Sequence, residues 1–315
     1  MNTVFVVGSL NIDQTIRVPS FPRAGETIRG SDATFSPGGK GANQAVAASR
    51  AGAAVRLVGR VGQDAHGAAI LQVLAESNID SSHVKLTDSA STGTAVIAVD
   101  DQGENQIILS PGANAALSFA DVDAGLATLT PNDVLVLQLE IPRDIVRHAA
   151  RAAKLCGAFV ILNAAPSPLE IEGLFDDIDL LVVNEQEIQD LARLANASGD
   201  LAELTETLPS VLGPAVLCTA GAQGAVTFLG RRPVHISAPE VSVADTTAAG
   251  DTFVGYLAAS LAADRELPAA MAIAGRAASI AVTRPGAVES IPWRHELPTL
   301  QDHDTQSAAL FLSHP

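Results

Sequence analysis

Short runs of Val, Ile and Leu recur along the chain between segments that are long enough to form helices. The runs do not alternate strictly between apolar and polar residues, which is typical of strands buried on both faces of a parallel sheet. Because helix-length segments separate them, the pattern predicts a doubly wound α/β fold, with a mainly parallel central sheet flanked by helices. The runs are Val4–Val7, Val55–Val58, Val134–Leu137, Phe159–Leu162, Leu180–Val183 and Ala215–Leu217.

Amide, carboxyl or hydroxyl side chains follow the last apolar residue of several of these runs. In open α/β sheets ligands bind outside the carboxyl ends of the strands, so this row of polar groups predicts a binding site there. Polar residues also simply mark strand ends, but that alternative explains less well why so many of them are amides, carboxylates or hydroxyls. The residues are Gln138, Glu140, Asn163, Asn184, Glu187, Thr219 and Asp245.

Two other parts of the chain alternate more cleanly and predict antiparallel hairpins with one exposed face. In one hairpin Thr15–Val18 pairs with Thr27–Arg29, and in the other Thr94–Val99 pairs with Gln106–Leu109. We therefore expect a small antiparallel sheet from about residues 12–34 and 92–110. It would belong to a single domain over residues 1–298, followed by a polar, peripheral tail at 299–315.

A turn rich in small residues marks the most informative part of the chain. Residues 241–244 alternate like a strand, and the apolar residues after Asp251 fall on one face of a helix. Ala248, Ala249 and Gly250 would then lie at a helix start, where unpaired N–H groups hold anions and small side chains allow close approach. A carboxylate beside a bound phosphoryl group is placed to take a proton from an attacking hydroxyl. Alternatively, Asp251 only caps the helix.

This turn resembles the signature of the ribokinase-like family of carbohydrate and nucleoside kinases. Residues 36–45, with the sequence SPGGKGANQA, are similar to the sugar-binding segment of that family, and the resemblance extends from about Val4 to Trp293. It implies a ribokinase-like fold whose small sheet is a lid over the sugar and often a homodimer interface. It also implies ATP-dependent phosphorylation of a small sugar, with Asp251 as general base. The first expected substrate is D-ribose, which would be converted to D-ribose 5-phosphate.

An uncharged sugar needs fixed donors and acceptors that penalise any missing partner. Asn11 and Asp13 offer an amide and a carboxylate, although an Asx turn leaving the first strand would use the same residues. Lys40 is not a P-loop lysine, because Gly41 follows it in place of Ser or Thr. The resemblance assigns the sugar contacts to Asn11, Asp13, Gly39, Lys40, Asn43, Glu140 and Asp251.

Residues 184–187 match an Asn-x-x-Glu motif of the same family, and residues 219–224 match its nucleotide loop. Glu187 would hold Mg²⁺ through water, since Mg²⁺ keeps several waters and takes few carboxylates. The alternative is a pair of polar residues that complements a helix dipole. The resemblance implies nucleotide contacts at Asn184, Thr219, Gly221, Gly224 and Gly250. Gly275 stands where the family often has an Asn or His, so the nucleoside contact made by that residue does not carry over.

A potassium site is also implied by the resemblance. Its ligands would be mainly backbone carbonyls, so the identity of the residues tests it poorly, and Arg284–Gly286 could equally form a plain turn. The seven histidines show no metal-ligand spacing, so no zinc site is expected. The positions that match the potassium site are Asp245, Thr247, Ala281, Arg284, Gly286 and Ser290.

Charge and composition narrow the possible partners and the compartment. The net charge of −16 argues against nucleic acid and anionic membranes as partners. Cys156 and Cys218 fall in apolar stretches and predict buried thiols in a reducing compartment. The run Val4–Val7 is too short for a signal peptide, and no run approaches the length of a membrane span. We therefore expect a soluble, cytoplasmic protein.

Other functions stay open within and outside the same chemistry. A kinase for another pentose, a keto-sugar acid or a nucleoside would use the same fold, although aromatics at 3% weigh against a nucleoside, which usually stacks on a ring. A non-catalytic sugar-responsive binding protein would not need Gly250 and Asp251 together, so the presence of both residues argues against this function. A dinucleotide oxidoreductase is disfavoured because Gly8–Asn11 follows the first run in place of Gly-x-Gly-x-x-Gly.

Overall fold

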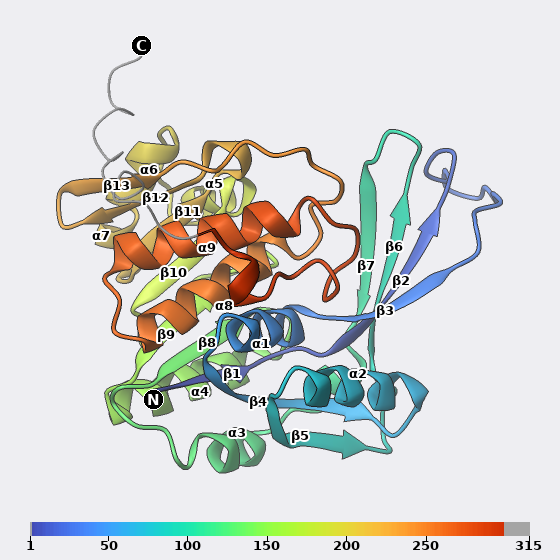
Figure 1. The fold of residues 1–315 in the computed structure, drawn as a ribbon, viewed down its shortest axis with the longest axis horizontal. Helices are drawn as coiled ribbons and strands as arrows, with labels where there is room; N and C mark the ends of the chain where they lie inside the picture. Colours follow the sequence, from blue (N-terminus) through green and yellow to red (C-terminus); the bar gives the residue numbers. More distant parts are fainter. Residues whose placement is uncertain (1, 299–315) are drawn as a thin grey trace.

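Within residues 2–298, which the computed structural model describes, the centre of the molecule is a nine-stranded sheet (Figure 1). The strand order is β13-β12-β11-β10-β9-β8-β1-β4-β5, parallel from β11 to β5 and antiparallel for β12 and β13. Each apolar run of the sequence forms one parallel strand, so the predicted sheet is confirmed. The strands are β1 (Thr3–Val7), β4 (Ala54–Gly62), β5 (Asp80–Thr87), β8 (Val134–Gln138), β9 (Phe159–Asn163), β10 (Leu180–Asn184), β11 (Ala215–Thr219), β12 (Ala225–Leu229) and β13 (Arg232–Ile236).

Helices cover both faces of this sheet. Val4 and Val6 of β1 pack toward one layer, and Phe5 and Val7 pack toward the other, so the inner strands contribute to two apolar cores. The first layer contains α1 (Lys40–Arg50), α2 (Ala65–Glu76), α8 (Ala249–Ala262) and α9 (Leu267–Ala281). The second contains α3 (Phe119–Leu126), α4 (Arg143–Cys156), α5 (Glu185–Leu194) and α6 (Leu201–Thr207). The shorter helical elements are α7 (Pro209–Leu212) and the 3₁₀ turns η1 (Gly112–Ala116), η2 (Gly221–Gln223) and η3 (Arg294–Glu296).

A four-stranded sheet stands to the side of the main body, at the right of Figure 1. Its order is β3-β2-β6-β7, with β2 (Asn11–Arg17), β3 (Thr34–Gly38), β6 (Gly93–Val99) and β7 (Asn105–Ser110). The β6–β7 hairpin was predicted and is confirmed. The predicted pairing of Thr15–Val18 with Thr27–Arg29 is wrong, because β2 pairs with β3 over five positions, more than the three residues at 27–29 could offer. The central pair β2–β6 is parallel.

A second correction concerns the segment before α8. Residues 241–244 were predicted to form a strand, but Val241 and Val243 are 41% and 60% exposed and lie in an irregular segment. Alternation makes a strand only where a neighbouring strand pairs with it. Here the amides of Ala244 and Asp245 instead donate to the carbonyl of Val282, at the end of α9. The predicted helix does start at the expected place, with Ala249 as its first residue.

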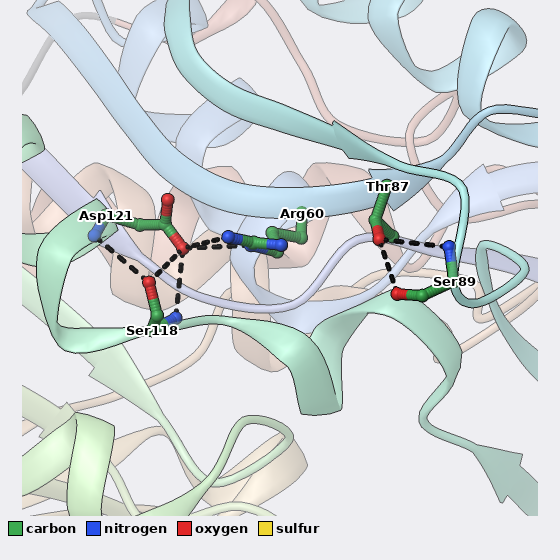
Figure 2. Close-up of polar contacts among 5 residues, drawn as sticks. All are labelled: Arg60, Thr87, Ser89, Ser118 and Asp121. Atoms are coloured by element: carbon green, nitrogen blue, oxygen red, sulfur yellow. Dashed lines mark hydrogen bonds and ion pairs between the residues drawn. The ribbon is translucent and has the colours of Figure 1, made fainter.

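The start of α3 is fixed to the sheet by a charged contact (Figure 2). The guanidinium of Arg60, on β4, donates to Oδ2 of Asp121 at 2.8 Å, and Ser118 and Asp121 form a capping box. Burial would raise the pKa of Asp121, but the hydrogen bonds from Arg60 and Ser118 lower it below its usual value. Thr87 and Ser89 close the turn that follows β5. The edge of the sheet at β4 and β5 is therefore held by polar side chains as well as by packing.

Helices α1 and α8 approach each other closely at Gly255. A Cβ atom at this position would lie 2.5 Å from the Cβ of Ala47 and 2.5 Å from the carbonyl oxygen of Gln44, both on α1. Only a residue without a side chain fits such a contact. As a result, the first turn of α1 and the first turn of α8 lie close together, although about 200 residues separate them in the sequence.

We predict that Gly255→Ala will destabilise the protein by about 1–3 kcal/mol, the usual cost of overpacking, because α1 must move away from α8. Gly275→Ala, in the interior of α9, is the matched control. An added Cβ there meets nothing within 4 Å, and Ala favours a helix over Gly by about 1 kcal/mol. Urea denaturation of the two variants should therefore give changes of opposite sign, and equal changes would contradict the packing argument.

Candidate active site

Polar side chains gather at the carboxyl ends of the parallel strands. In the sheet, β4 lies next to β1 in one direction and β9 lies next to β8 in the opposite direction, so the strand order reverses between β1 and β8. In open α/β sheets, ligands bind at the carboxyl ends of the strands near such a reversal. A cavity of about 200 Å³ opens at the ends of the strands β9, β10 and β11, beside the first turns of α1 and α8. Its lining brings together residues that the sequence analysis singled out: Lys40, Asn163, Asn184, Glu187, Thr219, Ala248, Gly250 and Asp251.

Asp251 faces α1 and does not cap its own helix. Its Oδ2 accepts a hydrogen bond from Nδ2 of Asn43 at 2.9 Å, and its Oδ1 accepts one from Nε2 of Gln44 at 2.9 Å. The N-cap position belongs to Ala248, which makes no side-chain cap hydrogen bond. Only 7% of Asp251 is exposed, so the carboxylate reaches the exterior mainly through the cavity. The alternative of a simple capping role for Asp251 is wrong.

The first turn of α8 offers backbone donors to the same cavity. Ala248 has a φ of 58°, in the left-handed region, so the chain turns sharply into the helix. The amide of Ala249 donates to the carbonyl of Thr246. Among the hydrogen bonds of residues 2–298, none is donated by the amides of Gly250 and Asp251. These N–H groups lie at the positive end of the helix dipole and are suited to an anion.

Glu140 and Asn11 line a separate cavity of about 360 Å³, and Glu140 connects several side chains there. Its Oε2 accepts hydrogen bonds from Oγ of Ser9 at 2.6 Å, from the amide of Lys40 at 3.1 Å and from Nδ2 of Asn11 at 3.4 Å. The Oδ1 of Asn11 accepts from Asn114 at 2.7 Å. Asn11 and Asp13 lie within β2, so the alternative of an Asx turn is wrong. Glycine at position 39 has a φ of 88°, which allows α1 to begin at Lys40.

Sequence reasoning missed several residues of this arrangement. Ser9 lies two residues after the first apolar run, and the rule that polar residues at strand ends face ligands would have found it. Gln44 lies within the sugar-binding motif, but nothing local shows that it contacts Asp251. Asn114, in η1, had no signal in the sequence at all, because its partners Leu10 and Asn11 are more than 100 residues away.

The site holds one ammonium group among several carboxylates. Burial, together with the negative charges of Glu140 and Asp251, raises the pKa of Asp13 to about 7. Burial alone would lower the pKa of Lys40, but Asp251, Glu140, Glu187 and Asp13 together raise it above its usual value. Lys40 is therefore a cation at neutral pH, between Glu140 and the cavity beside α8.

A larger pocket of about 550 Å³ adjoins the cavity on the side of α9. Thr219, Gly221, Gly224 and Gly250 line it, among mostly small and apolar residues. Gly224 has a φ of 94°, and a Cβ there would lie 1.9 Å from the carbonyl oxygen of Ile236, so the turn requires glycine. Gly275 also lines the pocket, and its missing side chain leaves open space.

Asn184 and Glu187 form a capping box at the start of α5. The amide of Glu187 donates to Oδ1 of Asn184 and the amide of Asn184 donates to Oε2 of Glu187, both at 2.8 Å. The interpretation of this pair as a helix start is confirmed. Both residues also line the 200 Å³ cavity, and burial raises the pKa of Glu187.

The residues assigned to potassium are only partly brought together. Oδ1 of Asp245 accepts from the amide and the hydroxyl of Thr247, and Oδ2 accepts from the amide of Gly286 at 3.0 Å. The guanidinium of Arg284 turns away to Glu296. The carbonyl of Ala281, at the end of α9, accepts from the amide of Arg284, and Ser290 donates to the carbonyl of Ala287.

Residues 2–298 carry few other features that point to a function. In that part of the chain no group of three or more His, Cys, Asp or Glu residues could hold a metal ion. None of the helices described there is long and apolar enough to cross a membrane. Cys156 and Cys218 are both free thiols; Cys218 is buried, as predicted, and Cys156 is half-buried.

The chain is similar to known proteins over nearly its whole length. Residues 1–294 match the family model described as pfkB family carbohydrate kinase. A ribokinase from Haemophilus influenzae is 37% identical over 302 residues, which cover 96% of this chain and 99% of that protein.

Two solved structures are similar over nearly the whole chain. A ribokinase from Thermotoga maritima has a TM-score of 0.86 at 33% identity and covers 94% of this chain and 97% of its own. A ribokinase from Arabidopsis thaliana, complexed with ribose and ATP, has a TM-score of 0.81 at 31% identity and covers 93% of this chain and 96% of its own.

The raised pKa of Asp13 predicts a pH-dependent stability. The folded pKa, about 7, lies above the ordinary value of 3.8, so the folded protein binds this proton more tightly and loses stability as the pH rises between the two values. Asp13→Asn should therefore melt at a higher temperature than the unmodified protein at pH 8, and the difference should vanish near pH 4.

Asp80→Asn provides the control of opposite sign. Hydrogen bonds, first from Ser82 and then from Arg56, lower the pKa of Asp80 to about 2, so its carboxylate stabilises the folded protein at neutral pH. Thermal melts at pH 8 should show stabilisation for Asp13→Asn and destabilisation for Asp80→Asn. A lower melting temperature for both variants would mean that Asp13 is not strained by burial.

Proposed function

The chain belongs to the pfkB family of carbohydrate kinases, and we propose that it transfers the terminal phosphoryl group of ATP to the 5-hydroxyl of D-ribose. The observation that carries this proposal is the position of Asp251. The carboxylate lies between the polar cluster around Glu140 and the cavity bordered by the free amides of α8. A kinase needs this arrangement, because its base must reach the hydroxyl at the place where the phosphoryl group is held.

The sugar would be held by the side chains that surround Glu140 and α1. The Oδ1 atom of Asn43 is buried without a hydrogen-bond partner, which a sugar hydroxyl would supply. Asn11, Asp13 and Glu140 add an amide and two carboxylates, with Gly39 and Lys40 at the start of α1. The cavity of about 360 Å³ over Asn11 and Glu140 has no aromatic ring among its described lining residues, which does not favour a nucleoside.

The transfer itself needs one proton acceptor and a set of fixed donors. The carboxylate of Asp251 takes the proton of the sugar hydroxyl as that oxygen forms its bond to the phosphorus. The bond to the β-phosphate breaks at the same time, and ADP leaves. The amides of Gly250 and Asp251 and the ammonium of Lys40 stabilise the charge on the transferred group. The small sheet would close over the sugar and exclude water, which competes as an acceptor.

The nucleotide and Mg²⁺ would occupy the other side of Asp251. Thr219, Gly221, Gly224 and Gly250 line the larger pocket, which suits a nucleotide. Mg²⁺ retains several waters, so Glu187 and Asn184 fit it without a cluster of carboxylates. When bound, the ion would neutralise part of the phosphate charge.

A monovalent cation would fix the backbone of the anion-binding turn at residues 248–250. Asp245 accepts hydrogen bonds from both Thr247 and Gly286, and Asp245 and Thr247 lie just before the turn at residues 248–250. Potassium held there, by Asp245, Thr247 and the carbonyls of residues 281–290, would fix the N–H groups of the turn without touching the substrate.

The chain would also form a homodimer through the small sheet. Ile107 and Ile108, on β7, are 54% and 71% exposed, and Phe35 on β3 and Leu109 on β7 are exposed as well. These side chains lie on the two edge strands of the small sheet. Exposed apolar side chains on one small sheet favour an interaction surface, and a second copy of the same surface is the simplest partner.

The function is tested by replacing the base. Asp251→Asn keeps the size of the side chain but cannot take a proton, so turnover of D-ribose with MgATP should fall about 10²–10⁴-fold, the range expected for a general base. ADP release over a panel of sugars and nucleosides measures it. Binding of ribose and ATP, followed by calorimetry, should persist. A variant that keeps most of its turnover would exclude Asp251 as the base.

The cation proposal predicts that activity is higher in potassium than in sodium at matched ionic strength. The effect should lie mainly in kcat, because fixed donors matter most in the transition state. Its size should stay below the roughly 100-fold loss that follows removal of a whole donor. Protein freed of potassium and assayed in each salt gives the measurement, and indifference to the cation would leave residues 284–286 as a plain turn.

The dimer proposal predicts that replacing both Ile107 and Ile108 by Asp yields a monomer in analytical ultracentrifugation. Leu155→Asp is the matched control, since Leu155 on α4 is 72% exposed and lies outside the small sheet. The control should leave the sedimentation coefficient unchanged. A protein that is already monomeric without any substitution would contradict the proposal.

A further inference from the structure

The buried amide side chains of Gln44, Gln138 and Asn163 form a hydrogen-bonded chain. This chain links the carboxylate of Asp251 to the central sheet. Nε2 of Gln44, on α1, donates to Oδ1 of Asp251 at 2.9 Å and to Oδ1 of Asn163 at 3.1 Å. Nε2 of Gln138, at the end of β8, donates to Oε1 of Gln44 at 2.8 Å. Nδ2 of Asn163, at the end of β9, donates to the carbonyl of Val182 on β10 at 3.1 Å. The chain therefore spans α1 and three neighbouring strands.

Each amide in this chain can take only one orientation. The carbonyl of Val182 only accepts, so Asn163 must present its NH₂ group there and its oxygen to Gln44. The carboxylate of Asp251 also only accepts in its ionised form, so Gln44 must turn its NH₂ group toward both acceptors. Its oxygen is then left for Gln138. Rotation of Gln44 by half a turn would break three hydrogen bonds at once.

We propose that Gln44, held in place by Gln138 and Asn163, is a positioning residue that fixes the carboxylate of Asp251 for proton transfer. Gln44 and Gln138 are fully buried, and neither lines the cavities around Asp251 and Glu140. They therefore act on the reaction through Asp251. This inference rests on the proposed kinase function, in which Asp251 is the base.

The charges around Asp251 explain why hydrogen bonds must fix the orientation of its carboxylate. Lys40 on α1 attracts it, whereas Asp13 on β2 and Glu187 on α5 repel it. An unsupported carboxylate would turn toward the ammonium group. Asn43 holds Oδ2 and Gln44 holds Oδ1, so donors at both oxygens fix the plane of the carboxylate against these forces. A base displaced by about 1 Å can lose on the order of 100-fold in rate.

The test uses substitutions that keep the side-chain length and remove the amide. Gln44→Met removes the donor to Asp251, and Gln138→Met removes only the group that holds Gln44. Both should lower kcat for D-ribose, by about 10- to 100-fold for Gln44→Met and less for Gln138→Met, with little change in KM for ribose or ATP. Gln72→Met is the matched control, because Gln72 donates at 2.8 Å to the carboxylate of Glu76 on the exposed side of α2. Its kcat should not change.

A double substitution separates positioning from a structural role. If Gln44 and Gln138 act through Asp251, then Gln44→Met and Gln138→Met should have no further effect on the residual kcat in an Asp251→Asn background. Equal losses in both backgrounds, or an unchanged kcat for both single variants, would overturn the proposal. Thermal melts identify a variant that fails to fold, and Gln138→Met, which leaves the contact with Asp251 chemically intact, then decides. An Asp251→Asn protein that is itself fully active would instead contradict the general-base role.

Discussion

The close contact between α1 and α8 is the constraint on which the rest of the site depends. It sets the carboxylate of Asp251 against the amides of Asn43 and Gln44, which lie 208 and 207 residues away in the sequence. Only small residues permit this approach: Gly255 meets Ala47 and the backbone of Gln44. The low aromatic content of the chain, 3%, fits the same requirement, because Ala-rich faces let helices pack at short distances. Close packing and the position of the base are therefore one property of the fold.

The electrostatics of the site follow from the need to hold a neutral sugar beside a highly charged nucleotide. Carboxylates suit the hydroxyls of a sugar, but they repel phosphate. Lys40, the free amides at the start of α8 and the proposed cations offset that repulsion in a protein whose net charge is −16. The high pKa of Asp13 shows the cost of collecting these carboxylates in one buried place. Polar groups at such a site are selected for the reaction, and the stability of the fold comes from the apolar cores on either side of the sheet.

The sequence predicted those features that arise from local patterns. Strands buried on both faces are continuous apolar runs, so β1 and β8–β11 could be located, and the rule for ligand sites in parallel sheets placed Asn163, Asn184 and Thr219 at one edge. Features that depend on a distant partner could not be predicted. Residues 241–244 have the pattern of a strand but no strand to pair with, and β2 pairs with β3 and β6 instead of with residues 27–29. For the same reason Asn114 and the Gln44–Asp251 contact became visible only in three dimensions.

The joining of α1 to α8 also has a consequence for the synthesis of the protein. The ribosome completes α1 long before α8, so the apolar face of α1 and the first strands lack a permanent cover while some 200 residues are added. Contacts of such long sequence separation form slowly, because the intervening chain must first be ordered. A nascent or truncated chain would expose Ala- and Val-rich surface during that interval, which is the kind of surface that chaperones bind and that aggregates. For the same reason Asp251, the proposed base, can meet Asn43 and Gln44 only after α8 has been synthesised.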